Sequence, residues 1–364
     1  MTHRTRLAAV TLGIATLIAT ATATPATATA TATAPTPASG TGTGTGHSQY
    51  SGTVPLGTTP TPTTFQLRDP ARGNMRTLDA LNQTTTPGVL FTDADNVWGD
   101  GTPAHRQTAA VDVHYATAVT WDFYQAAFGR SGVRGDGVGT TSRVHYGTGF
   151  GNAFWSDSCA CVSYGDGATP GRPPTSLDVV GHELAHGLTS STAGLLYSGE
   201  PGGLNEGTSD ILAAAGEFFA DNKTDVGDYL IGERVFDGPP RRMDRPSADG
   251  VSPDHWSPNV GSLPPHAASG PARHFYYLLA EGSGPKVING VAYDSPTYDG
   301  SKLLGIGRDE ATRIWYRALT TSMRSTTNYA GARTATLKAA SDLYGPSSPQ
   351  VARVAAAWKA VNVG

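Results

Sequence analysis

The spacing of apolar positions changes near the middle of the chain. Between about residues 50 and 171, short apolar runs are interrupted every few residues by Gly, Thr and Asp, a pattern typical of strands and turns. The exception is a helical interval in which Val111, Tyr115, Val119 and Phe123 recur every four residues. In the second half of the chain the spacing is mostly helical. A β-rich half followed by an α-rich half predicts an α+β fold rather than a parallel α/β sheet.

Three helices are predicted near the C-terminus. Two of them cover residues 308–323 and 327–343. The third begins at Pro349, a position that tolerates proline because the first N–H groups of a helix have no intrahelical partner, and Ser348 precedes it as an N-cap. Its apolar residues fall on one helical face: Val351, Val354, Ala355, Trp358 and Val361.

The first fifty residues differ from the rest. Arg4 and Arg6 precede an apolar run over residues 7–18, which is too short to span a bilayer, and small residues follow it. This pattern predicts a secretory signal peptide over residues 1–28, and therefore export from the cell. Residues 29–50 consist of Ala-Thr, Thr-Pro and Gly-Thr repeats with almost no apolar surface to bury, which predicts a flexible linker.

Charge and cysteine content narrow the class of protein. The 26 basic and 30 acidic residues give a net charge of −4, so the chain offers no basic field for nucleic acid or anionic membranes. Two cysteines are too few for a disulfide scaffold. Cys159 and Cys161 fall in an expected strand, where their Cα atoms would be about 6.6 Å apart. That separation is near the upper limit for a disulfide, so a bridge with local distortion and two free thiols are both consistent with the sequence.

The strongest chemical signal is the sequence His-Glu-Leu-Ala-His at residues 182–186. On a helix, His182 and His186 lie one turn apart and can direct their imidazoles at one point. Two neutral imidazoles suit zinc, and a catalytic zinc has three protein ligands with a fourth position left to water. Glu183 lies about 100° around the helix from His182, where it can face that water without binding the metal. The alternative, a surface helix with two histidines, requires a chance match that is rare in a chain with 10 histidines.

A third ligand is expected on a second helix. Glu206 lies 20 residues after His186, and Asp210 follows Glu206 by one helical turn, so both carboxylates can point to one side. A neighbouring antiparallel helix that carries Glu206 would complete a site of two histidines and one glutamate. Further acceptors would then orient the imidazoles.

Other short motifs accompany the metal-binding residues in a fixed order. They are Asn152-Ala153-Phe154-Trp155, Tyr164-Gly165-Asp166-Gly167, Leu177-Asp178-Val179-Val180, Ala193-Gly194-Leu195-x-Tyr197, Ile231-Gly232-Glu233, Pro253-Asp254-His255, His266-x-x-Ser269-Gly270 and Asp342-Leu343-Tyr344-Gly345. Together with residues 182–186 and with Asn205-Glu206-x-x-Ser209-Asp210, this order resembles the thermolysin family of secreted zinc endopeptidases. The resemblance extends from about Val89 to the C-terminus. It implies a thermolysin-like fold with a β-rich N-terminal domain over residues 51–197, a mainly α-helical C-terminal domain over residues 198–364, and the zinc site in the cleft between them.

The resemblance also assigns roles to individual residues. The zinc ligands would be His182, His186 and Glu206. Glu183 would act as the general base, and Tyr197 and His266 would donate hydrogen bonds to the oxyanion of the reaction. The other residues would hold the substrate backbone (Asn152, Ala153 and Arg241) or orient the ligand histidines (Asn205 and Asp210).

A second metal site is expected from four acidic residues: Asp178, Glu217, Asp228 and Glu233. Carboxylate oxygens are hard ligands that suit calcium rather than zinc, and the resemblance places the family's calcium site here. A solvated acidic surface is the alternative interpretation. Asp93 and Asp95 are a weaker candidate for calcium, and an exposed loop explains them equally well.

Three features depart from the family pattern. Gly261 stands five residues before His266, where an aspartate usually holds the oxyanion histidine, so either His266 is less well fixed or another carboxylate such as Asp254 stands in. Arg172 and Pro173 occupy positions where bulky apolar residues would line the pocket for the residue after the cut, so a preference for Leu or Phe there does not follow. The predicted export signal leads almost directly into the catalytic body, without the large pro-segment of the family.

The sequence therefore predicts a secreted, extracellular zinc endopeptidase that hydrolyses peptide bonds with metal-activated water, on the amino side of apolar residues. Its cofactors would be one zinc ion and one or more calcium ions, its partners would be protein or peptide substrates, and it would act as a monomer away from nucleic acid and membranes. The alternative is a protease-like binding or matrix protein with little turnover, limited by the missing pro-segment. A zinc aminopeptidase is disfavoured because the motif Gly-x-Met-Glu-Asn is missing.

Overall fold

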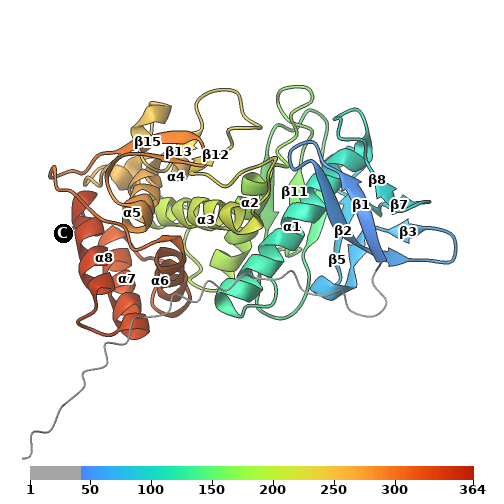
Figure 1. The fold of residues 1–364 in the computed structure, drawn as a ribbon. Coiled ribbons are helices and arrows are strands. Elements are labelled where there is room, and N and C mark those ends of the chain that lie inside the picture. The colour runs from blue at the N-terminus through green and yellow to red at the C-terminus, as the bar shows by residue number, and fades with distance from the viewer. Residues whose placement is uncertain (1–41) are drawn as a thin grey trace, which may run out of the picture. The chain divides into compact units, whose positions relative to one another are not determined.

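A computed structural model describes residues 42–364, which run from a sheet-rich N-terminal part to a helical C-terminal part (Figure 1). The predicted signal peptide at residues 1–28 and the first part of the predicted linker, residues 29–41, lie outside the described residues. The α+β fold class that the sequence predicts is confirmed by this order of elements.

The first sheet has five strands, one of which comes from the expected linker. Across the sheet, the strands are β7 (Thr92–Asp93), β3 (Phe65–Gln66), β2 (Thr53–Pro60), β1 (Gly42–His47) and β8 (Val97–Trp98). β1 pairs antiparallel with β2 along its whole length and parallel with β8. The predicted flexible linker over residues 29–50 is therefore wrong from residue 42 onward.

Backbone pairing and close packing explain why this low-complexity segment is ordered. A Cβ atom on Gly46 would lie 2.6 Å from Val111 Cγ1 and 2.7 Å from Leu56 Cδ1, so glycine allows β1 to approach both neighbours closely. Backbone N–H and C=O groups of β1 pair with β2 on one side and with β8 on the other, and this pairing needs no large apolar side chain. Composition gives no sign of such a strand because its order comes from the backbone.

The second sheet carries a strand that lies next to the predicted metal-binding helix. Across this sheet the strands are β10 (Ala153–Ser156), β11 (Cys161–Tyr164), β9 (Thr141–Val144), β5 (Met75–Asp79) and β4 (Arg68–Asp69), and β6 (Val89–Leu90) also pairs with β5. β10 and β11 form an antiparallel hairpin, whereas β11, β9 and β5 are parallel. Because β10 is at the edge, one side of its backbone is unpaired within the sheet.

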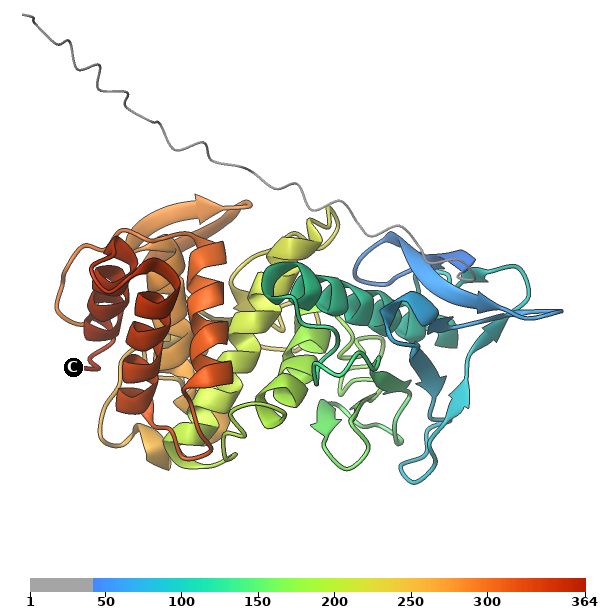
Figure 2. The same cartoon turned by 90° about the horizontal axis from the view of Figure 1, so that it is seen from below.

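Three long helices connect the sheets with the C-terminal part. They are α1 (Arg106–Phe128), α2 (Leu177–Ser190) and α3 (Gly199–Ala220). The helical interval predicted around Val111 and Phe123 is confirmed as α1, in which both side chains are buried. The helix contacts strands of both sheets as well as α2 and α3. In two perpendicular views, α1, α2 and α3 lie between the first strands and the last helices (Figure 1 and Figure 2).

The C-terminal part is a group of packed helices with two small hairpins. The helices are α4 (Pro265–Ala268), α5 (Gly270–Glu281), α6 (Arg308–Thr321), α7 (Tyr329–Tyr344) and α8 (Pro349–Ala360). The hairpins are β12 (Leu230–Ile231) with β13 (Arg241–Arg242), and β14 (Gly284–Ile288) with β15 (Val291–Ser295). This part also contains the 3₁₀ turns η2 (Pro246–Asp249) and η3 (Val260–Ser262), whereas a third 3₁₀ turn, η1 (Pro70–Arg72), lies in the N-terminal part.

The three helices predicted near the C-terminus are confirmed as α6, α7 and α8. Ser348 Oγ accepts a hydrogen bond from the N–H of Val351, as expected for an N-cap. Trp358 of α8 stacks on Phe275 of α5 with ring centroids 3.8 Å apart, which joins the last helix to the core. Among residues 42–364, no helix is both long and apolar enough to cross a membrane.

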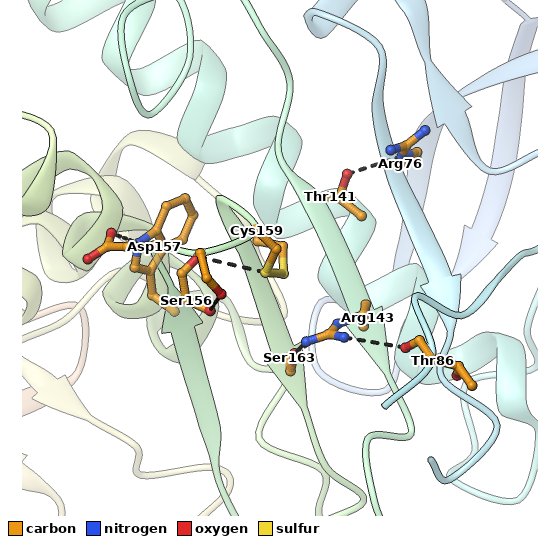
Figure 3. The surroundings of a disulfide bond; sticks show 11 residues. Arg76, Thr86, Thr141, Arg143, Ser156, Asp157, Cys159 and Ser163 are labelled. Carbon is orange, nitrogen blue, oxygen red and sulfur yellow. Dashed lines mark hydrogen bonds between the residues drawn. A yellow bond between two sulfur atoms is a disulfide. The ribbon is translucent and has the colours of Figure 1, made fainter. Parts of the chain in front are cut away.

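A disulfide joins Cys159 to Cys161 at the tip of the hairpin formed by β10 and β11 (Figure 3). Only Cys161 belongs to a strand, where it pairs with Ser156, because the chain turns before it and Ala160 adopts a left-handed φ of 47°. The turn brings the two Cα atoms to 5.2 Å, which is closer than an extended strand would allow. The two alternatives that the sequence allowed are thus decided in favour of the bridge.

Replacing both cysteines by serine should destabilise the protein only modestly. A disulfide that closes a loop of so few residues removes little entropy from the unfolded chain, so we expect a loss of about 1–2 kcal/mol in the free energy of unfolding. Urea unfolding of the wild type and of the Cys159→Ser/Cys161→Ser variant measures this difference. A loss above about 4 kcal/mol would mean that the hairpin tip supports much more of the structure than its position suggests.

Candidate metal centre and active site

The centre of the site is the contact between α2 and α3. His182 Nδ1 bonds to Asp210 and His186 Nδ1 bonds to Asn205, so increasing residue numbers on α2 meet decreasing numbers on α3 and the helices are antiparallel. Small residues allow the close approach, since a Cβ atom on Gly181 would lie 3.3 Å from Ala213 Cα. On the opposite face of α3, a Cβ on Gly203 would lie 2.6 Å from the carbonyl oxygen of Ala268, and one on Gly207 would lie 2.7 Å from Ala272 Cβ.

The three predicted zinc ligands come together between these helices. The Nε2 atoms of His182 and His186 are 3.1 Å apart. His182 Nε2 lies 3.3 Å from Glu206 Oε2, and His186 Nε2 lies 3.5 Å from Glu206 Oε1. Glu206 is fully buried. The spacing of one helical turn on α2, together with the antiparallel neighbour, thus produces the arrangement that the sequence predicts.

Hydrogen bonds fix the tautomers of both histidines. Asn205 Nδ2 donates to the carbonyl oxygen of Leu195 at 2.9 Å, so its Oδ1 faces His186 Nδ1, which must donate at 2.8 Å. His182 Nδ1 donates to Asp210 Oδ1 at 2.9 Å. With the Nδ1 protons engaged in this way, each neutral ring directs an Nε2 lone pair toward the other ring and toward Glu206.

This arrangement favours a cation. Two imidazole lone pairs and a carboxylate converge, and Glu206 Oε2 is buried without a hydrogen-bond partner among the described residues. Burial alone would lower the pKa of His182, but the hydrogen bond to Asp210 and the nearby carboxylate of Glu206 raise this pKa to about 10, so the site favours a positive charge on Nε2, and a metal ion bound there would displace the proton. Two imidazole nitrogens and one carboxylate with outer acceptors are the donor set of a catalytic zinc site, so these residues fit zinc.

Glu183 lies beside the ligands and is held from the second sheet. Its Oε2 accepts a hydrogen bond of 3.1 Å from the N–H of Trp155, in the edge strand β10. Glu183 is 8% exposed, so its carboxylate is screened from bulk water but not sealed off. A carboxylate in this position can accept a proton from a water next to the ligand cluster.

The two predicted oxyanion donors reach the cluster from its open side. Tyr197, just before α3, donates from its hydroxyl to Glu206 Oε1, and His266 Nε2 in α4 lies 3.3 Å from Glu206 Oε2. Tyr197 is 54% exposed and the His266 side chain 56% exposed, unlike the buried ligands His182 and Glu206. Both groups can therefore meet a substrate that approaches from solvent.

Of the two alternatives for His266, the one in which Asp254 stands in for the missing aspartate is contradicted by the structure. The carboxylate of Asp254 accepts hydrogen bonds from the backbone N–H and the hydroxyl of Ser247, not from His266. Gly261 is part of η3, where a Cβ atom would lie 3.4 Å from Glu200 Cγ. The Glu200 carboxylate is itself engaged by other groups, so it does not replace the aspartate either.

The three residues expected to hold the substrate backbone lie around the cluster. Ala153 begins β10 and is buried, and Asn152 precedes it with an exposed side chain. Arg241 begins β13 and donates to both oxygens of Asp210, at 2.8 Å from Nη2 and 3.2 Å from Nε. Arg241 thus also fixes the carboxylate that orients His182.

A second group of acidic residues lies at the C-terminal end of α3. Carboxylate oxygens of Glu217, Asp225 and Glu233 lie within 4.8 Å of one another. The sequence pattern does not single out Asp225, although it falls between Glu217 and Asp228. Asp228 Oδ1 instead accepts the N–H of Leu230 at 2.6 Å, while its own N–H donates to Glu217 Oε2 at 2.9 Å.

The acidic group also favours a cation. Burial and then repulsion by Asp178 raise the pKa of Asp225 to about 6, and burial with neighbouring carboxylates raises the pKa of Glu233 to about 9. Asp225 Oδ2 and Glu233 Oε2 are buried without hydrogen-bond partners among residues 42–364. Asp178 accepts the N–H of Gly232 at 2.6 Å beside them. An all-oxygen donor set with unsatisfied atoms fits calcium.

Comparison with known proteins agrees with this geometry. The family model described as the thermolysin metallopeptidase catalytic domain matches residues 43–190, and the model described as the thermolysin metallopeptidase alpha-helical domain matches residues 193–363. The chain belongs to the thermolysin family of metallopeptidases.

Individual relatives support this assignment. The chain is 54% identical over 322 residues to the transglutaminase-activating metalloprotease of Streptomyces mobaraensis, which covers 87% of this chain and 42% of that protein. It is 37% identical over 321 residues to bacillolysin of Bacillus cereus, covering 85% and 53%. The chain therefore spans about half the length of these relatives. A solved structure of the precursor of protealysin, a metalloproteinase from Serratia proteamaculans, superimposes with a TM-score of 0.61 at 27% identity and covers 80% of this chain and 87% of that one.

Proposed function

We propose that the protein is a secreted zinc endopeptidase. The observation that carries this proposal is the pair of Nε2 atoms 3.1 Å apart, both directed at the buried Glu206, with Glu183 fixed beside them by Trp155. A zinc ion at this position would act as a Lewis acid on the peptide carbonyl and lower the pKa of a water molecule. Glu183 would accept the proton of that water and deliver it to the leaving amine.

The remaining residues would position the substrate and stabilise charge. Tyr197 and His266 would donate hydrogen bonds to the oxygen of the cleaved carbonyl as negative charge develops on it. The unpaired edge of β10 at Asn152 and Ala153, together with Arg241, would hold the peptide backbone. Because neither Asp254 nor Glu200 takes the place of the missing aspartate, the ring of His266 is fixed less firmly, so its contribution would be smaller than that of Glu183.

The same proposal extends to calcium, export and specificity. The buried oxygens of Glu217, Asp225 and Glu233 support a structural calcium site. The charged N-terminus followed by an apolar run supports export, and the N-terminus of the mature protein in a culture supernatant tests it. Cleavage on the amino side of apolar residues rests on the family alone, because Arg172 and Pro173 differ from the usual pocket residues.

Purified protein should clear casein, and phenanthroline should abolish the clearing. Removal of zinc takes away the Lewis acid, and added zinc should restore activity because hydrogen bonds to Asp210 and Asn205 fix the rings of His182 and His186. Zinc content by elemental analysis and the cleavage positions by mass spectrometry complete the experiment. Clearing that is unaffected by phenanthroline would rule out zinc catalysis, and stoichiometric zinc without any cleavage would favour a binding protein with little turnover.

A further inference from the structure

A buried arginine lies behind the zinc ligands. Arg273 is in α5 and is 0% exposed. A guanidinium removed from water is tolerated only when it meets acceptors and opposite charge. Its Nη2 donates to Asp249 Oδ2 at 3.0 Å, and its Nη1 donates to Ser269 Oγ at 2.9 Å. The contacts of this side chain therefore reach η2 and the junction of α4 with α5.

The same guanidinium also meets two groups of the active site. Its Nη1 lies 3.5 Å from Asp210 Oδ2, and this carboxylate accepts the Nδ1 proton of the zinc ligand His182. Nη1 also donates to the carbonyl oxygen of His266 at 3.5 Å, while Ser269 Oγ donates to that oxygen at 2.7 Å. One planar group thus joins the carboxylate behind a zinc ligand to the turn that presents the oxyanion histidine.

Charge balance shows why this contact matters. Asp210 is fully buried, and its carboxylate forms ion pairs with both Arg241 and Arg273. A buried carboxylate needs opposite charge and hydrogen-bond donors, and Arg241, His182 and Arg273 supply them at 2.8, 2.9 and 3.5 Å. Asp249 in turn balances Arg273 and is itself held by the N–H and hydroxyl of Ser252.

We propose that Arg273 is a positioning residue of the active site, which fixes the Asp210 carboxylate against His182 and fixes the turn of His266 at the same time. This inference rests on the proposed zinc endopeptidase function. A lysine could supply the charge, but its single ammonium group lacks the planar fork that reaches both Asp249 and the Asp210 side. The role belongs to the shape of arginine as well as to its charge.

The test compares Arg273→Gln with Asp249→Asn, a matched variant that removes a partner of Arg273 remote from the zinc ligands. Loss of the outer partner of a ligand histidine weakens metal binding by about 10–100-fold, and Arg273 acts on His182 through that partner, Asp210, so Arg273→Gln should raise the zinc dissociation constant in a chelator competition by about 10-fold, the lower end of that range. It should also lower kcat more than it raises KM. Asp249→Asn keeps the guanidinium of Arg273 next to Asp210. The zinc dissociation constant of this variant should change by less than about 3-fold, even if the variant loses as much stability as Arg273→Gln.

The outcomes separate this inference from the function on which it rests. Wild-type protein that binds no zinc overturns the proposed function and the inference with it. Wild-type binding with an unchanged dissociation constant in Arg273→Gln, or equal changes in both variants, overturns the inference alone. Should Arg273→Gln fail to fold, Arg273→Lys takes its place: an intermediate loss of affinity of roughly 3–10-fold supports the role of the planar fork, and wild-type affinity refutes it.

Discussion

Glu183→Gln should lower kcat/KM by about 10²–10⁴-fold while leaving zinc bound. The amide has nearly the same shape as the carboxylate, and its oxygen can still accept the hydrogen bond from the N–H of Trp155. It cannot accept the proton of the attacking water, so the chemical step loses its base. Hydrolysis of a chromogenic peptide, followed at saturating and limiting substrate, measures the change.

Two controls make this result specific. The zinc content and the thermal midpoint of the variant should match those of the wild type, because the hydrogen bond of the Glu183 side chain goes to the N–H of Trp155 and not to His182, His186 or Glu206. Glu310→Gln, in α6, changes the same chemical group where the carboxylate accepts a hydrogen bond from Gln350 at 2.9 Å, and it should retain full activity. Wild-type activity in Glu183→Gln would exclude this residue as the base and leave the metal site without its proton acceptor.

Removal of calcium should cause the largest loss of stability. Without a cation, the buried carboxylates of Glu217, Asp225 and Glu233 repel one another, and binding to the folded state alone stabilises it by mass action. At a calcium concentration 100 times the dissociation constant, this contribution is about 2.7 kcal/mol, and EGTA should abolish it. Thermal unfolding with and without EGTA, together with the rate of self-digestion, measures the effect.

A variant locates the effect at this site. Asp225→Asn removes the charge of one of the three converging carboxylates and should weaken calcium binding. The stability of the variant should therefore depend less on calcium, and EGTA should lower its melting temperature by less than that of the wild type. Asp93→Asn, at the end of β7 and in the weaker calcium candidate, should leave the sensitivity to EGTA unchanged. If EGTA does not alter the melting temperature of the wild type, the protein has no stabilising calcium site.

The convergence of His182, His186 and Glu206 is predictable from the sequence because helical geometry determines it. The interval of four residues between His182 and His186 fixes their common face, and the interval of four between Glu206 and Asp210 does the same on α3. Once both helices form, their antiparallel contact brings all four side chains together. The α+β fold follows from the change in apolar spacing for the same reason, since periodicity reports local structure directly.

Features that depend on irregular backbone or on distant partners were not predictable. The choice between Asp225 and Asp228 as a partner of Glu217 depends on the loop after α3, which has no period. The strand β1 depends on pairing with β2, which composition does not report. Arg273 gives no local signal, because a single arginine in an apolar helix shows its role only when the carboxylates of Asp210 and Asp249 are placed around it.

The glycines of α3 set a limit on how this protein can be engineered. Replacing helical glycine by alanine is a common route to greater heat resistance, because it reduces the freedom of the unfolded chain. At Gly203 and Gly207 the added methyl group would meet Ala268 and Ala272 at less than van der Waals distance. Relief of that clash would push α3 away from its neighbours and carry Glu206 with it, so a thermostabilised variant must obtain its gains elsewhere in the chain.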